Sequence, residues 1–106
     1  MLSGVEKVQL DSNNPNPDAK VIIIHQQAVM ECALNILSDL VRYKTVILKA
    51  KGESIPTAVS VANVLTENML KGNSKIVDIS VDSENFDGKY GSTLISTIGI
   101  TITKTN

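Results

Sequence analysis

The chain has 106 residues, which is enough for one domain with one core and too few for a second. Its 42% hydrophobic residues predict folding rather than disorder, and its 3% aromatic residues predict an aliphatic core. The net charge of −1 and the pI of about 5.7 disfavour strong nonspecific DNA binding by the isolated chain, because such proteins are usually basic. This balance still allows a local basic patch.

The single cysteine, Cys32, excludes a disulfide within the chain and is typical of a reducing compartment. It lies in an apolar pattern of helical period, which favours core packing over a reactive thiol. No apolar run approaches the roughly 20 residues of a membrane span, and the N-terminus lacks the features of a signal peptide. We therefore expect a cytoplasmic protein, with a chromosomal or nuclear location as the alternative, and no membrane partner.

Turn-forming residues dominate the stretch DSNNPNPD at positions 11–18. Residues 1–18 are therefore predicted to be a flexible tail, and residues 19–106 to be the folded domain. The domain begins with the β-branched run Val21–Ile24, which predicts a buried strand.

Between Gln27 and Arg42 the apolar residues recur with the period of a helix. The face predicted to meet the core consists of Met30, Ala33, Leu34, Leu37 and Val41. A short β-branched strand, Thr45–Ala50, is predicted next.

A second helix is predicted from Ser54, a plausible N-cap, with Pro56 tolerated in its first turn and Gly72-Asn73 at its end. Its core stripe is predicted to be Ile55, Ala58, Val59, Ala62, Leu65 and Met69. Val61 and Val64 widen this stripe beyond what one sheet face needs, which indicates a surface for a second copy.

Two alternating segments close the chain, Lys75–Ser83 and Leu94–Thr103, separated by an Asp87-Gly88 hairpin signal. In the first, Val77, Ile79 and Val81 are predicted to share a face. The order is β-α-β-α-β-β. This order predicts an α/β protein of the α+β sandwich type, with a four-stranded mixed sheet and two helices on one face.

The residues give little support for catalysis. His25 is the only histidine and has no cysteine or second histidine with which to bind metal. Asp78, Asp82 and Glu84 occupy polar positions of an alternating strand and its turn, so a solvated sheet face is favoured over a metal site. The loop KGES at 51–54 lacks the order of a phosphate-binding Walker motif. We expect no enzyme activity, no catalytic or metal-binding residues and no cofactor.

Binding has more support. Lys49, Lys51 and Gly52 precede a helix start, where unpaired backbone N–H groups favour phosphate. The alternative is a tight connection with lysines that serve solubility. The predicted hairpin carries Lys89 with Phe86 and Tyr90, which could lie in a groove or stack on a base.

Four segments resemble the Alba family of small DNA- and RNA-binding proteins. They are IHQQAVM at 24–30, LKAKGESI at 48–55, Ala58-Val59, and Ser96–Ile98. The resemblance covers Lys20–Lys104. It implies a fold like the C-terminal domain of translation initiation factor three, and a dimer that coats DNA or binds RNA through the loop after the second strand and the long hairpin.

The chain also departs from the family pattern at several positions. Gln26 and Gln27 stand where the family typically has a lysine pair, which removes charge as acetylation would. Lys51 stands where arginine is common and preserves charge, whereas Glu53 reverses it. Ser80 and Asp82 replace residues that are often basic or small. We therefore expect reduced DNA affinity, with RNA favoured over duplex DNA.

Two sets of site residues follow from the residue types and the resemblance together. The predicted nucleic-acid-binding residues are His25, Gln26, Gln27, Lys49, Lys51, Gly52, Lys89 and Tyr90. The predicted dimer interface is Val61, Val64, Leu65, Met69 and Ile98.

Alternative functions remain open. One is a non-catalytic subunit that pairs with a more basic Alba-like partner in chromatin or in a ribonucleoprotein of the ribonuclease P or MRP type. Another is a regulatory protein like the stage V sporulation protein S group, which shares the fold. The loop KAKGES at 49–54 resembles Alba more closely. The opposite charges of an acidic chain and a basic relative would favour a heterodimer.

Overall fold

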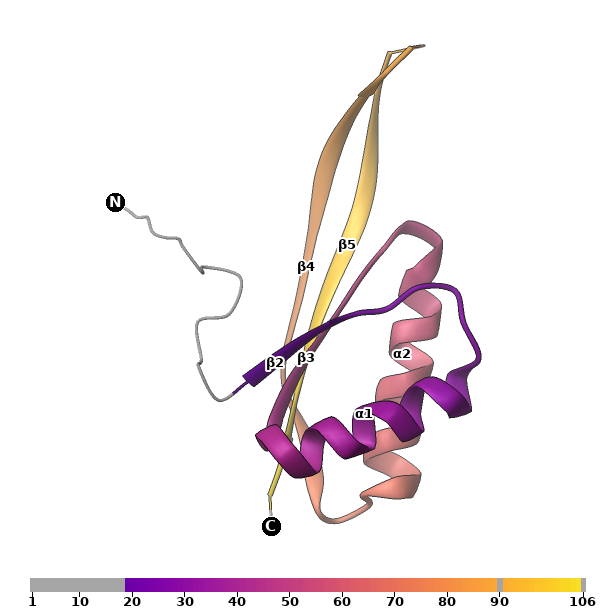
Figure 1. Cartoon of the computed structure of the whole chain (residues 1–106). Helices are drawn as coiled ribbons and strands as arrows, with labels where there is room; N and C mark the ends of the chain where they lie inside the picture. Colours follow the sequence, from indigo (N-terminus) through magenta and orange to yellow (C-terminus); the bar gives the residue numbers. More distant parts are fainter. Residues whose placement is uncertain (1–18, 90, 106) are drawn as a thin grey trace, which may run out of the picture.

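The computed structural model describes residues 19–89 and 91–105 (Figure 1). The predicted tail, residues 1–18, lies outside the described residues. The strands are β2 (Ala19–Ile23), β3 (Thr45–Lys51), β4 (Ser74–Gly88) and β5 (Gly91–Lys104). The helices are α1 (Val29–Tyr43) and α2 (Ile55–Val64), with a 3₁₀ turn at Gly52–Ser54 and a π-helical turn at Leu65–Met69.

One four-stranded sheet has the order β2-β3-β5-β4. β2 and β3 are parallel, and β5 is antiparallel to both β3 and β4. Both helices cover the same face of this sheet (Figure 1). The predicted fold class, a mixed sheet with two helices on one face, is confirmed.

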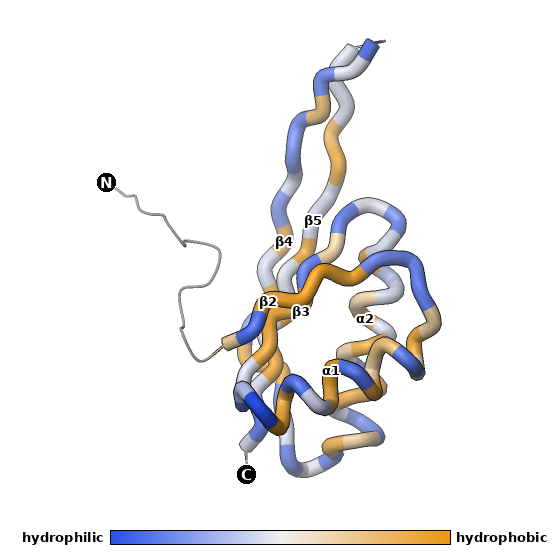
Figure 2. The backbone as a smooth tube through the Cα atoms, in the orientation of Figure 1, coloured by the Kyte–Doolittle hydropathy of each residue, from blue (hydrophilic) through white to orange (hydrophobic). Residues whose placement is uncertain are grey.

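Aliphatic side chains fill the space between the helices and the sheet, as the scarcity of aromatic residues predicted. Figure 2 shows hydrophobic stretches along β3 and β5. The fully buried side chains include Ile24, Ile36, Leu40, Val46, Leu48, Val61, Leu65 and Ile102. Each such side chain contributes about 1.5–3 kcal/mol by leaving water.

The core-facing side of α1 differs from the predicted one. Its buried residues are Cys32, Ala33, Ile36 and Leu40. Met30, Leu34 and Val41 are instead 56%, 55% and 68% exposed, so most of the predicted stripe was wrong. Several apolar residues surround this helix, and periodicity alone does not decide which stripe of such a helix meets the sheet.

The second helix is interrupted where one continuous helix was predicted. Thr66 is buried in the π-helical turn and donates its Oγ1 proton to the carbonyl oxygen of Ala62 at 2.9 Å. Such a bond from a buried hydroxyl to the preceding turn bends helices. Ser54 lies at the predicted N-cap position, but its side chain makes no capping bond. Pro56 lies in the first turn of α2 as predicted.

The β4–β5 hairpin extends well beyond the body of the molecule (Figure 1). A bulge between Ile76 and Asp78 shifts the register, so that Ile76 pairs with Ile102 and Ile79 with Ile100. An inserted residue reverses the alternation of faces, so Ile76 rather than Val77 shares the helix-facing side with Ile79. The predicted alternation through Val77 was therefore wrong at that residue.

Among the described residues, neither helix is long and apolar enough to cross a lipid bilayer.

Candidate nucleic-acid interface

Two loops from distant parts of the chain meet beside the edge of the sheet. After β2, the backbone N–H of Ile24 donates to the carbonyl oxygen of Lys49 at 2.8 Å, which fixes the start of the 24–28 loop beside β3. Within that loop, the backbone N–H of His25 donates to Oε1 of Gln27 at 2.9 Å. α1 begins only at Val29. The predicted binding residues His25, Gln26 and Gln27 are therefore exposed loop residues.

Gly52 shapes the second loop, which joins β3 to α2. Lys51 is the last residue of β3, and Gly52 has a φ of +57° before the short 3₁₀ turn. Only glycine enters this left-handed region without a steric penalty. The helix N-terminus that follows has no side-chain cap. The backbone N–H of Ile55 donates to the carbonyl oxygen of Gly52, and Pro56 has no N–H to offer.

Two rows of residues cross the sheet on the face away from the helices. Lys49 pairs with Gly99 and Gly99 with Ser80, while Lys51 pairs with Thr97 and Thr97 with Asp82. Because neighbouring strands lie about 4.8 Å apart, each lysine is roughly 10 Å from the β4 residue of its row.

A hollow of about 390 Å³ lies over these rows. Gly99 forms its floor, and a Cβ atom at that position would lie 3.0 Å from Oγ of Ser80. The remaining lining residues are Ile23, Ile24, His25, Lys49, Ala50, Lys51, Ser54, Ser80, Asp82, Glu84, Thr97 and Ile98. The hollow has lysines on its β3 side and carboxylates on its β4 side.

The loop cation has a carboxylate partner. Nζ of Lys51 lies 3.5 Å from Oε1 of Glu84 and 5.9 Å from the centre of the Phe86 ring. Both side chains of the ion pair are more than half exposed, so the pair contributes at most about 1 kcal/mol and is screened by salt. A phosphate can therefore compete with Glu84 for Lys51.

The hairpin does not bring its own predicted residues to the hollow. Lys89 is exposed beside the hairpin tip, which lies away from the body (Figure 1), and Tyr90 lies outside the described residues. Near the tip, Oγ of Ser92 donates to Oδ1 of Asp87 at 2.6 Å. The predicted binding residues therefore form two separate groups, one at the loops and one at the tip.

The residues predicted to form a dimer interface divide in a similar way. Val61 and Leu65 are fully buried inside the chain and have no surface to offer a second copy, which corrects that part of the prediction. Val64, Met69 and Ile98 are half-buried at the edge of the core. Val61 and Val64, which widen the apolar stripe of α2, contribute at least partly to packing within the chain, because α2 packs against both the sheet and α1.

Chemically reactive groups are sparse in the described part of the chain. It contains no cluster of three His, Cys, Asp or Glu side chains suited to a metal ion. Cys32 is buried, and this burial raises the pKa of its thiol. The neutral thiol is favoured in the folded chain, so its contribution to stability is present at neutral pH and is lost as pH rises through the raised pKa.

Sequence reasoning interpreted Asp82 and Glu84, with Asp78, as a solvated sheet face. It noted Ser80 only as a departure from the family pattern and did not single out Thr97 or Gly99. The strand order and the register after the bulge bring these residues, apart from Asp78, beside Lys49 and Lys51. The alternation of β4 did indicate that the three polar residues share one face.

Comparisons with known proteins give consistent results. The family model described as Alba matches residues 20–83. The DNA/RNA-binding protein Alba of Picrophilus torridus is 26% identical over 89 residues, which cover 82% of this chain and 98% of that protein. The protein of the same name from Thermoplasma acidophilum is 27% identical over 88 residues, with the same coverage of 82% and 98%. The solved structure of Alba from Thermoplasma volcanium has a TM-score of 0.70 and 27% identity, and covers 80% of this chain and 100% of its own.

Proposed function

The chain belongs to the Alba family, and on that premise we propose that it is a dimeric, non-catalytic protein that binds nucleic acid through the hollow beside β3. The observation that carries the proposal is that Lys49 and Lys51 both line the hollow, on the face of the sheet away from the helices. The relatives are named as DNA/RNA-binding proteins, which supports the same function. The site of action is proposed to be the cytoplasm or the chromosome.

Unpaired RNA is proposed as the preferred ligand over duplex DNA. Asp82 and Glu84 line the hollow and repel the dense phosphates of a duplex. A single strand can place its phosphates on the lysine side and its bases over Gly99, because unpaired bases can be splayed away from the backbone. Carboxylates then serve as acceptors for base N–H groups.

Few cations face the ligand, so the salt dependence of binding is expected to be shallow. Each phosphate neutralised adds about −0.7 to the slope of log K against log salt for single strands and about −0.9 for duplex DNA. Titration of fluorescent single-stranded RNA and duplex DNA at two salt concentrations tests the proposal. Tighter binding of the RNA, with a slope near −2, is expected.

Substitution of Lys51 tests whether the nucleic acid binds at the hollow. Lys51→Glu places a carboxylate beside Glu84 and is expected to abolish binding at the hollow. The matched control is Asn35→Glu with Ser38→Glu, which makes the same change of charge on the exposed side of α1. Equal effects of the two variants would mean that the hollow is not the binding site, and no binding of either nucleic acid would refute the proposed function.

The proposed dimer uses an apolar surface on the helix-facing side of the hairpin. Val64, Met69 and Ile98 are half-buried at the edge of the core. Ile98 pairs with Val81, and Val81 and Ile79 are 72% and 56% exposed. A second copy that covered these residues would remove their side chains from water, at about 25 cal/mol per Å² of apolar surface.

A second candidate function is a subunit that pairs with a more basic Alba-like protein. The observation that favours it is the Lys51–Glu84 ion pair, which offsets the charge of the loop cation in this chain. Native mass spectrometry after co-expression with such a protein tests it, and homodimers at every mixing ratio would exclude it.

A further inference from the structure

Lysines gather at the end of the sheet opposite the hairpin tip. β2, β3 and β4 begin at this end, and β5 finishes there, because β5 is antiparallel to its neighbours. A lysine lies in or directly before each strand at this end, in the spatial order Lys20, Lys44, Lys104 and Lys75, where Lys44 immediately precedes β3. Sequence positions more than 80 residues apart are thereby brought together.

Three of these lysines are neighbours. The backbone N–H of Lys104 donates to the carbonyl oxygen of Lys44 at 2.8 Å, and Lys75 pairs with Thr103, the residue before Lys104. With strands about 4.8 Å apart, the backbones of Lys44, Lys104 and Lys75 span roughly 10 Å.

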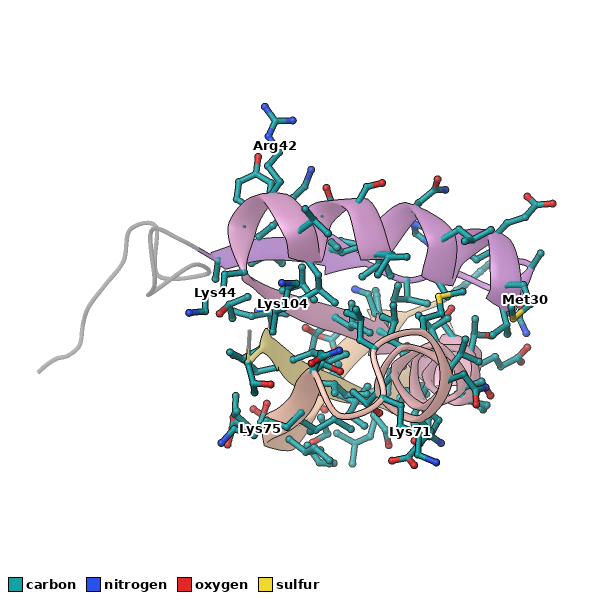
Figure 3. All side chains as sticks on the ribbon, turned by 90° about the horizontal axis from the view of Figure 1, so that it is seen from below. Met30, Arg42, Lys44, Lys71, Lys75 and Lys104 are labelled. Atoms are coloured by element: carbon teal, nitrogen blue, oxygen red, sulfur yellow. The ribbon has the colours of Figure 1, made fainter. Side chains whose placement is uncertain are left out.

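Figure 3, a view of this end of the molecule, shows Arg42 and Lys71 on either side of these lysines. We call Arg42, Lys44, Lys71, Lys75 and Lys104 together the basic end. Arg42 lies in the last turn of α1, and Lys71 follows the π-helical turn. Arg42, Lys44, Lys71 and Lys75 are exposed, and Lys104 is partly exposed.

Lys20 is close to the basic end but is held by other groups. Its Nζ lies 3.6 Å from Oδ1 of Asp39 and 5.5 Å from the centre of the Tyr43 ring. Arg42 lies over the same ring at 5.7 Å. Tyr43 therefore orients two cations at this end through cation–π contacts.

The charges of the described residues are divided unequally along the molecule. The half near the basic end carries six Lys or Arg, including Lys20, against the carboxylates Asp39, Glu67 and Asp78. The half with the hollow and the hairpin tip carries Lys49, Lys51 and Lys89. Four carboxylates accompany those three lysines, namely Glu53, Asp82, Glu84 and Asp87. The chain as a whole is nearly neutral, yet its described cations outnumber its carboxylates at the basic end and not at the hollow.

We propose that the basic end is a second nucleic-acid-binding surface, which holds the phosphates of a different RNA segment from the one at the hollow. The proposal rests on the proposed function. Phosphate contacts require cations and no base-reading groups, and the backbones of Lys44, Lys104 and Lys75 lie within the span of a few phosphates. Because the two surfaces lie at opposite ends of the sheet, one molecule would bridge two segments of RNA.

The test uses two RNA strands of the same sequence, one biotinylated and held on beads and one fluorescent. The full-length protein is expected to retain the fluorescent strand on the beads, and the strand is released by high salt. The variant Arg42→Gln with Lys44→Asn and Lys75→Gln removes three exposed cations of the basic end. Asparagine is chosen at Lys44 because that residue has a φ of +72°, which asparagine tolerates.

The comparison variant is Lys49→Gln with Lys51→Gln and Lys89→Gln, which removes the same charge from the other half and is expected to weaken the binding of a single strand in solution. The basic-end variant is expected to lose retention of the second strand while it still binds one fluorescent strand in solution. The salt slope for one strand in solution is expected to stay at about −2 in this variant, because that strand is held at the hollow. The variant Asp78→Asn, which removes a carboxylate near the basic end, is expected to increase retention severalfold.

The outcomes separate the two proposals. Failure of the unaltered protein to bind even one strand would refute the proposed function and the bridging with it. Binding of one strand without retention of the second would refute only the bridging. Thermal unfolding confirms that the basic-end variant and the unaltered protein are both folded. If the two then retain the second strand equally, bridging arises elsewhere, for example from two hollows in a dimer.

Discussion

At the scale of single residues, the hollow is a site where opposite charges compete. Lys51 is paired with Glu84, whereas Lys49 forms no ion pair with any described residue. Gln26 and Gln27 lie in the adjoining loop and bring hydrogen-bond donors without charge. Binding there is expected to depend on small changes in charge, because the existing ion pair is exposed and weak.

Restoring cations to the 24–28 loop tests this balance. The double variant Gln26→Lys with Gln27→Lys is expected to bind single-stranded RNA more tightly and with a steeper salt slope, by up to about 0.7 for each added phosphate contact. Fluorescence anisotropy at several salt concentrations measures both. Asn35→Lys with Ser38→Lys adds the same charge to the exposed side of α1 and serves as the control. Equal gains in the two double variants would place the binding surface elsewhere.

A backbone requirement is tested at Gly52. Its φ of +57° makes Gly52→Ala unfavourable by about 1–2 kcal/mol, although the added Cβ would meet Ile95 only at an ordinary 3.7 Å. Urea unfolding should show this loss, and RNA affinity should fall because the loop changes shape. Gly88→Ala, where no positive φ occurs, is the control. Unchanged stability of Gly52→Ala would contradict the assigned conformation.

At the scale of elements, α1 has apolar residues on two sides, and only one of them packs in the core. Ile36 and Leu40 are buried against the sheet and α2, while Leu34 and Val41 remain more than half exposed. The buried side follows from the connection of α1 to two parallel strands, β2 and β3, which fixes how the helix lies across the sheet. The exposed side leaves single apolar residues in water, as many helices do.

The difference between these two sides predicts different mutational costs. Leu40→Ala is expected to lower the free energy of unfolding by about 2–5 kcal/mol, because Leu40 is fully buried and truncation leaves a cavity. Leu34→Ala, the same change at a residue 55% exposed, is expected to cost about 0.5 kcal/mol. Denaturant unfolding by circular dichroism gives both values. Equal costs would mean that α1 packs through the other side.

At the scale of the whole molecule, the hairpin is the part that is least covered by its own chain. The contacts between β4 and β5 hold it together, and its apolar residues Val81 and Leu94 are 72% and 69% exposed. Exposed apolar residues grouped on one side of a projecting element are typical of a surface that associates with another molecule. This surface adjoins Ile98, which lies at the edge of the core.

The proposed dimer is tested by mass. Sedimentation equilibrium of the unaltered protein at micromolar concentration should give close to twice 11.4 kDa. Val81→Asp should give the monomer mass without unfolding the chain, since Val81 is exposed in the monomer and a carboxylate would be buried unpaired in the dimer. Val41→Asp, at a residue 68% exposed on α1, should remain dimeric. A single species of 11.4 kDa for the unaltered protein would exclude the dimer.

The sequence by itself determined the order of elements and the family. Changes of period along the chain located both helices and all four strands of the domain, because side chains alternate every two residues in strands and every 3.6 in helices. The segment 48–55 also placed Lys49, Lys51 and Gly52 at a strand–helix connection, since this motif is local in sequence.

Only the tertiary structure decided which distant residues meet. Glu84 lies beside Lys51 because β5 separates β3 from β4 and because a bulge shifts the β4 register. Neither the strand order nor the bulge can be predicted from a local sequence pattern. The buried side of α1 and the grouping of Lys44, Lys104 and Lys75 depend in the same way on the packing of helices and on strand order. Local periodicity fixes the faces of an element, whereas the neighbours of each face are fixed by contacts between segments far apart in the chain.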